Sequence, residues 1–284
     1  MRLTGLVRDP AGRFSWLKTV VLLAVLTPAA VLALRWQAQD LGPRPNTEAI
    51  HIAGLWAIRL LVLTLAVTPA RAVLDWGRVV MLRRMLGVSA ACYAVGHLTL
   101  YAFDQRWRLL HVASEIALRF YLTIGFIALL GLLALAATST DRWQRRLGAR
   151  WKKLHRLVFP IGVLALFHYG IQSKADVTNM VFLAGLFAWL MGWRLLKRRW
   201  QQRLWPLAPL ALGAGLAASV IEAAWYAVRN HVDPTLVWRT NFDLAYGPRA
   251  AVWVLIVGMV VLAFAALRRL RRRRVMPRGV VRQA

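Results

Sequence analysis

The stretch LHRLVFPIGVLALFHYG, residues 154–170, decides how this chain folds, because it is an apolar run of helix length with a histidine near each end. At about 1.5 Å of rise per residue, His155 and His168 would stand roughly 20 Å apart along a helix, which covers most of a hydrocarbon core about 30 Å thick. Ionisable side chains at membrane depth are costly, so they usually face the bundle interior and mark a cofactor or a transfer route. The stretch therefore indicates a spanning helix with a functional group toward each membrane face.

The composition places the rest of the chain in the same setting. Of the 284 residues, 59% are hydrophobic, which is far above the value for an ordinary soluble domain. The net charge of +27 comes from short basic clusters between apolar runs, as membrane topology demands, so we expect no nucleic-acid partner. Cys92 is the only cysteine, which excludes an intrachain disulfide, a cysteine-ligated iron–sulfur cluster and a zinc finger.

Continuous apolar runs of spanning length recur along the chain, and their lack of alternation favours helices over strands. They cover residues 16–34, 50–68, 85–103, 117–137, 154–171, 177–193, 207–228 and 250–267. We therefore expect an all-α integral membrane protein, a polytopic bundle of about eight transmembrane helices in the lipid bilayer. Most of the 38 Lys and Arg residues would lie on the side of the two termini, which predicts that both termini are cytoplasmic. No internal repeat stands out.

Two histidines on different runs occur at comparable depth. With both termini inside, the runs 85–103 and 154–171 both lead outward, and His97 and His168 lie near their outer ends. A b-type haem needs two neutral imidazoles that project from facing helices into an apolar slot. We expect His97 and His168 to be its iron ligands; the alternative is that each is a lone polar residue bonded to a neighbouring helix.

The role of His155 is open, because it lies in a basic run where an interfacial cation is also expected. A second, inner haem ligated by His155 would need a partner about fourteen residues before His97, and that residue is Arg83. Arginine stays protonated and is a poor iron ligand, so Arg83 would instead clamp a propionate or a flavin phosphate.

Helical phase adds a further constraint on His155. Thirteen residues of straight helix rotate a side chain by about 220°, which turns His155 away from the face of His168. Pro160 and Gly162 lie between them and could kink the helix and change that phase.

Further charged side chains occur within or beside the runs. Arg59, Arg119 and His51 are candidates to bind the carboxylates of haem, although Arg119 and His51 could simply reach toward the membrane surface. Glu222 is a candidate quinone or proton site without a visible partner in the sequence. No dinucleotide fingerprint, Walker sequence or hydrolase motif occurs, so electrons would come from quinol or from a separate flavoprotein.

The chain resembles the ferric-reductase-like transmembrane family over about residues 15–198. The stretches that carry the resemblance, in uninterrupted order, are HIAG at 51–54, LAVTP at 65–69, RRMLG at 83–87, GHLTLY at 96–101, FYLT at 120–123, TST at 138–140, LG at 147–148, WKKLH at 151–155 and FHY at 167–169.

This resemblance implies a six-helix haem-binding core and, as cofactors, haem b (one or two) and FMN. It places the haem histidines at His97, His155 and His168. Related oxidases carry two histidines on each of two helices, and Arg83 replaces one of them here. The implied setting is the bacterial cell inner membrane, where the protein would pass electrons from quinone to a periplasmic molybdopterin methionine sulfoxide reductase subunit.

On this basis we divide the chain into four segments and weigh three functions. The segments are a cytoplasmic tail at 1–15, a haem domain at 16–200, a two-helix extension at 201–267 and a basic cytoplasmic tail at 268–284. The leading function is an electron-transfer subunit rather than a catalytic subunit. The alternatives are a stand-alone ferric or quinone reductase, and a transporter with structural histidines.

Overall fold

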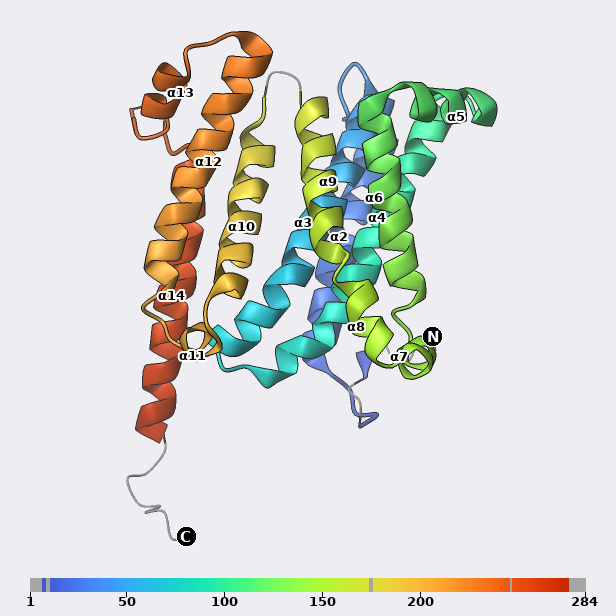
Figure 1. Cartoon of the computed structure of the whole chain (residues 1–284). Coiled ribbons are helices and arrows are strands. Elements are labelled where there is room, and N and C mark those ends of the chain that lie inside the picture. Colours follow the sequence, from blue (N-terminus) through green and yellow to red (C-terminus); the bar gives the residue numbers. More distant parts are fainter. Residues whose placement is uncertain (1–6, 9–10, 174–175, 246, 276–284) are drawn as a thin grey trace. The chain divides into compact units, whose positions relative to one another are not determined.

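The computed structural model describes residues 7–8, 11–173, 176–245 and 247–275. Within these ranges the secondary-structure elements are all helices, which confirms the all-α prediction (Figure 1). Parts of the expected tails at 1–15 and 268–284 lie outside the described residues.

Among the residues that the structure describes, seven helices are long and apolar enough to cross a membrane, which confirms a polytopic membrane protein. These spans are Trp16–Gln37 (α2), Pro45–Val73 (α3), Gly77–Asp104 (η1, Gly77–Met81, followed by α4, Leu82–Asp104), Phe120–Ala137 (α6), Ala149–Gln172, Leu207–Asn230 (α12) and Ala250–Arg271, within α14 (Ala250–Val275). The remaining run, 177–193, forms the 18-residue helix α10 (Thr178–Leu195), which is not among the seven. Polar residues in its first turn and Arg194 near its end make α10 less apolar than the sequence run suggested.

The span Ala149–Gln172, which contains His155 and His168, is interrupted, in line with the kink that Pro160 and Gly162 allowed. It consists of α8 (Ala149–His155) and α9 (Val158–Gln172). Pro160 explains the position of the break, because proline has no N–H to bond the carbonyl of residue i−4, here Arg156, and its ring crowds that carbonyl. His155 is thus the last residue of one helix, and His168 lies on another.

The chain divides into two compact units, and the first contains residues 1–67 and 80–175. In this unit α6 packs against α9, α4 and the short helix α5 (Leu109–Leu118), and α7 (Asp141–Leu147) precedes α8. The helices α6 and α9 approach closely, since a Cβ on Gly131 would lie 2.7 Å from Cδ1 of Ile161. The apolar helix α5 was not expected from the sequence.

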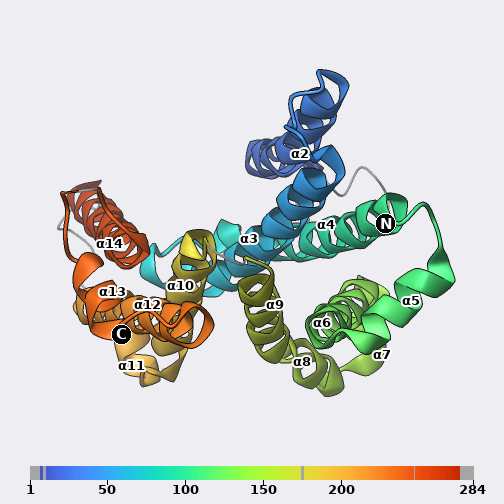
Figure 2. The same cartoon turned by 90° about the horizontal axis from the view of Figure 1, so that it is seen from above.

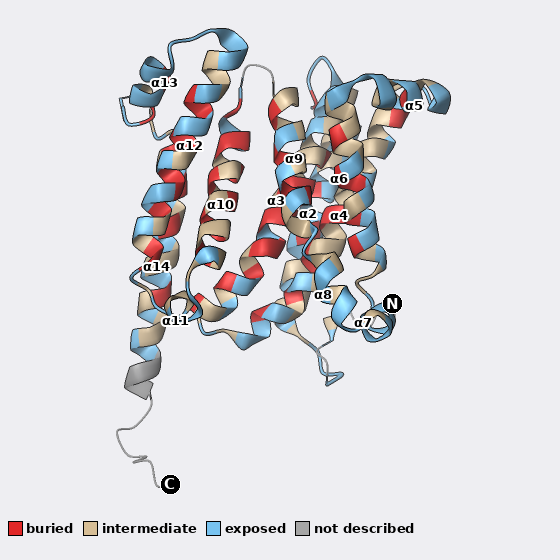
Figure 3. Ribbon diagram, viewed as in Figure 1, coloured by how far each residue is buried: buried red, intermediate tan, exposed pale blue. Residues whose placement is uncertain are grey.

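Helix α2 is joined to α4 through Tyr93. The hydroxyl of Tyr93 donates to the carbonyl of Val25 at 2.8 Å and accepts from the backbone N–H of Ala29 at 3.0 Å. The hydroxyl thus inserts between the carbonyl of Val25 and the N–H of Ala29, which would otherwise bond each other within α2. Pro28 is the residue before Ala29. Most other large apolar side chains of α2 are exposed, as expected for a surface that faces lipid (Figure 3).

The second unit contains residues 68–79 and 176–284, and α10, α12 and α14 form its core (Figure 2). Small residues allow these helices to meet closely: a Cβ on Gly185 would lie 2.6 Å from Val254, and one on Gly258 would lie 2.3 Å from the Cβ of Ala211. Two short helices, α11 (Arg198–Gln201) and α13 (Pro234–Thr240), complete the unit.

Candidate functional site

The structure brings His97 of α4 and His168 of α9 together inside the first unit. The centroids of the two imidazole rings are 6.2 Å apart, and the ring planes are inclined at 84°. Both side chains are partly buried, and each lies a few residues before the C-terminal end of its helix. Residues 71 positions apart in the sequence therefore form one site.

Each imidazole is held by a hydrogen bond to a backbone carbonyl. Nδ1 of His97 lies 2.8 Å from the oxygen of Ile50 on α3, and Nδ1 of His168 lies 2.8 Å from the oxygen of Tyr121 on α6. A carbonyl oxygen can only accept, so Nδ1 carries the proton in both rings. The remaining nitrogen, Nε2, is then unprotonated, which is the form that ligates a metal.

The pair fits haem ligation by its spacing and by its chemistry. A bond from a first-row metal to imidazole is about 2.0 Å and the ring centre lies about 1 Å behind the nitrogen, so two imidazoles on opposite faces of one iron have centroids about 6 Å apart. The observed 6.2 Å agrees with this value. The described residues contain no group of three or more His, Cys, Asp or Glu side chains that could hold a metal ion.

His155 has a different environment. Its ring stacks on Trp151 with centroids 3.8 Å apart, and its Nδ1 lies 3.2 Å from the carbonyl of Trp151. Its Nε2 lies 3.4 Å from Oγ of Ser139. In the part of the chain that the structure describes, no second imidazole stacks on or contacts His155, whereas Arg83 is exposed and lies within electrostatic range of it.

The candidate cofactor-binding cations lie at different places. Arg59 is partly buried and stacks on Trp56 at 5.1 Å, within α3. His51 is exposed and follows the residue whose carbonyl holds His97. His51 also lies within electrostatic range of His97.

Arg119 lies at the start of α6, where its backbone is extended. Its Nε lies 2.7 Å from a carboxylate oxygen of Glu115, and its guanidinium donates to the hydroxyl of Tyr121 at 3.3 Å. The hydrogen bond to Tyr121, together with the charge of Glu115, raises the pKa of Arg119 above its usual value. A permanent cation therefore lies two residues before the carbonyl that holds His168.

The second unit contains a buried polar cluster that the sequence did not reveal. Glu222 of α12 is only 1% exposed, and it forms an ion pair with Arg249. Its other carboxylate oxygen accepts from Nδ2 of Asn241 at 2.8 Å. Glu222 showed no partner in the sequence because its partners lie 19 and 27 residues further along the chain. Both oxygens of the carboxylate therefore have partners within the second unit.

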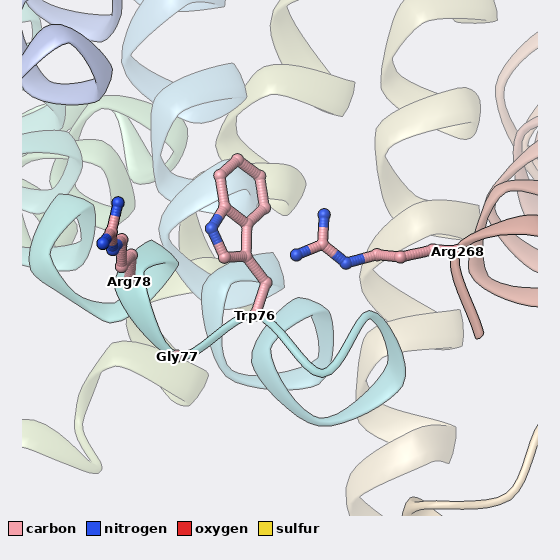
Figure 4. A pocket seen from close by; sticks show the side chains of 4 residues that line it. All are labelled: Trp76, Gly77, Arg78 and Arg268. Atoms are coloured by element: carbon pink, nitrogen blue, oxygen red, sulfur yellow. The ribbon is translucent and has the colours of Figure 1, made fainter. Parts of the chain in front are cut away.

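A pocket in the second unit is lined by Trp76, Gly77, Arg78 and Arg268 (Figure 4). The guanidinium of Arg268 lies 5.1 Å from the centre of the Trp76 ring. The adjacent Arg269 donates to the carbonyls of Val73 and Gln202 at 3.0 and 2.8 Å, and thus ties the end of α14 to the end of α3.

Comparison with known proteins agrees with this architecture. The family described as ferric reductase like transmembrane component matches residues 53–166, a range that includes His97 and His155 and ends just before His168. No solved structure was found to match the chain.

Several relatives are similar over most of their length. The protein-methionine-sulfoxide reductase heme-binding subunit MsrQ of Xanthomonas campestris pv. campestris (strain 8004) is 44% identical over 188 residues, which cover 64% of this chain and 86% of that protein. The MsrQ subunit of Xanthomonas axonopodis pv. citri is 43% identical over the same lengths. That of Rhodospirillum rubrum is 38% identical over 190 residues, with 66% of this chain and 89% of the relative covered.

Proposed function

Because the chain belongs to the MsrQ family of haem-binding membrane subunits, we propose that it carries electrons across the bacterial inner membrane through haem b held by His97 and His168. The observation that supports this proposal most directly is the 6.2 Å separation of two imidazoles that both have Nε2 unprotonated. Haem supplies one-electron transfer when it is bound. The chain's own residues orient the ligands: the carbonyls of Ile50 and Tyr121 fix the tautomer and the direction of each ring.

The donor and the acceptor are part of the same proposal. The chain has no nucleotide-binding motif, which favours the quinone pool as the donor, directly or through FMN. The relatives are named as subunits of a protein-methionine-sulfoxide reductase, which favours a periplasmic molybdopterin methionine sulfoxide reductase subunit as the acceptor. The excess of Lys and Arg on one side supports cytoplasmic termini, and the imidazole pair would then lie near the periplasmic face.

We further propose one haem at the imidazole pair and a supporting role for His155 on the cytoplasmic side. Arg83, which lies within electrostatic range of His155, would bind a flavin phosphate or a propionate there. His51, Arg59 and Arg119 remain candidates for the haem carboxylates. The haem domain would occupy 16–200 and the extension 201–267.

The first test is a reduced-minus-oxidised optical spectrum of the detergent-purified protein, with the haem-to-protein ratio measured as the pyridine haemochrome. We expect a b-type α-band and one haem per chain. His97→Ala and His168→Ala should each abolish the low-spin spectrum, whereas His111→Ala, in α5, should leave it unchanged. Well-folded protein without haem, or both ligand variants with an unchanged spectrum, would refute the proposal.

A further inference from the structure

Each imidazole of the pair lies directly against a glycine. A Cβ added to Gly54 of α3 would lie 2.9 Å from Nδ1 and 3.1 Å from Cε1 of His97. A Cβ added to Gly125 of α6 would lie 2.7 Å from both of these atoms of His168. Contacts this short leave no room for a methyl group, so each ring occupies the volume that a side chain would otherwise fill.

The glycine and the carbonyl that holds each ring are one helical turn apart. Ile50 and Gly54 are separated by four residues on α3, and Tyr121 and Gly125 by four residues on α6. In an α-helix the carbonyl of residue i bonds the N–H of residue i+4, so the accepting oxygen lies beside the glycine. The missing side chain therefore opens the path along which Nδ1 reaches that oxygen.

The two arrangements are related by one constant shift in the sequence. Adding 71 to the numbers of Ile50, Gly54 and His97 gives the numbers of Tyr121, Gly125 and His168. In both arrangements the histidine and the residue whose carbonyl it bonds are 47 positions apart. The buried residues of α6 also match buried residues of α3 at this shift. The matched pairs are Ala53 with Ile124, Ala57 with Ala128, Ile58 with Leu129, Leu61 with Leu132, and Thr64 with Leu135.

This relationship corrects the expectation that the chain has no internal repeat. Few of the matched side chains are identical, and the segments between the paired helices differ: η1 precedes α4, whereas α7 and α8 precede α9. The repeat is therefore visible in contacts and burial rather than in the letters of the sequence.

We propose that Gly54 and Gly125 are positioning residues that set the orientation of the two iron ligands, each as part of one copy of a repeated helix pair, α3–α4 and α6–α9. The inference rests on the proposed haem function and adds residues to the same site. A bond from Nδ1–H to a carbonyl raises the basicity of a ligating imidazole, and the basicity of axial ligands tunes the potential of haem iron. A methyl group at either glycine should push the ring away from its carbonyl and so make the ligand less basic.

The test compares Gly54→Ala and Gly125→Ala with Gly96→Ala. Gly96 is the matched control, because it adjoins His97 on α4 and no atom beyond its own helix backbone and chain neighbours lies within 4 Å of an added Cβ. In both test variants we expect a higher midpoint potential, an altered low-spin electron paramagnetic resonance signal and about tenfold weaker haem retention. Gly96→Ala should match the wild type in all three measurements.

A second measurement uses only the wild-type protein. The ring planes are inclined at 84°, so the wild-type ferric protein should give the strongly anisotropic low-spin signal of nearly perpendicular axial ligands. A signal typical of parallel ligand planes would overturn the proposal. So would Gly54→Ala and Gly125→Ala proteins with wild-type potential, signal and haem content.

These outcomes are distinct from a failure of the proposed function. If haem is bound and is lost in His97→Ala and His168→Ala, but both glycine variants behave like Gly96→Ala, only the positioning role is wrong. If the folded wild-type protein binds no haem, the haem function itself is wrong, and the positioning role falls with it.

Discussion

Arg84 of α4 forms an ion pair with Asp141, the first residue of α7. The hydrogen bond from Arg84, together with its charge, lowers the pKa of Asp141 below the usual value for an aspartate. The pair links the N-terminal end of α4, the helix that carries His97, to the segment that leads into α8 and His155. Both side chains are partly exposed to solvent, so water screens their attraction.

Asp141→Asn should therefore lower the stability of the protein by less than about 1 kcal/mol at neutral pH. Because the folded-state pKa is depressed, the stabilisation is fully present above the unfolded value of about 3.9 and is lost as the pH falls through the folded value. The measurement is the difference in Tm between the wild type and the variant in detergent, from pH 7 down to pH 3. A difference that stays constant over this range would show that the charge pair does not cause it.

His155→Ala should leave the spectrum of the imidazole pair intact, because His155 contacts Trp151 and Ser139 and neither His97 nor His168. Electron entry from the cytoplasmic side should slow, and this is measured as the rate of haem reduction by a quinol in reconstituted vesicles. A haem-to-protein ratio in this variant that is half the wild-type ratio would contradict our proposal of a single haem and would place a second haem at His155.

Arg249→Met should destabilise the second unit by about 3–5 kcal/mol, because it leaves the buried carboxylate of Glu222 without its counter-charge. Glu222→Gln should cost less, since an amide oxygen can still accept from Asn241. Thermal unfolding followed by tryptophan fluorescence compares the two variants. The haem spectrum should persist in both variants, and its loss would show that the first unit depends on this cluster.

Gly258→Ala and Gly213→Ala should have opposite effects on stability. A Cβ on Gly258 would lie 2.3 Å from the Cβ of Ala211, so the contact between α14 and α12 must open, at a cost of about 1–3 kcal/mol. At Gly213, no atom outside its own part of the helix lies within 4 Å of the added Cβ, and alanine should stabilise α12 by about 0.5–1 kcal/mol. Equal changes in Tm would show that this helix contact is not tightly packed.

Much of the fold could be predicted, because hydropathy and helix length are local properties. The run 207–228 became α12, Leu207–Asn230, and the run 85–103 became α4 with small changes at its ends. The break between His155 and His168 was foreseen only as a possible kink at Pro160 and Gly162, whereas the structure ends one helix at His155 and begins the next at Val158, because Pro160 cannot bond the carbonyl of Arg156.

The candidate site was predictable in part. The pairing of His97 with His168 could be predicted, because the assignment of spans and their directions gives the two histidines similar depths in the membrane. Their hydrogen bonds to Ile50 and Tyr121 could not be predicted, because every residue has a backbone carbonyl and the residue type does not indicate which carbonyl accepts. The glycines were equally hidden, as nothing local distinguishes Gly125 from Gly96.

The sequence by itself determined that this protein is a helical membrane protein, that its basic residues cluster between the apolar runs, and which histidines pair, since each of these follows from side-chain chemistry read along the chain. Only the tertiary structure decided which ring nitrogen is protonated, which glycines receive the imidazoles, and that α3–α4 and α6–α9 repeat one arrangement. These features are contacts between residues 43 or more positions apart. Such contacts depend on how the helices pack, which no local pattern encodes.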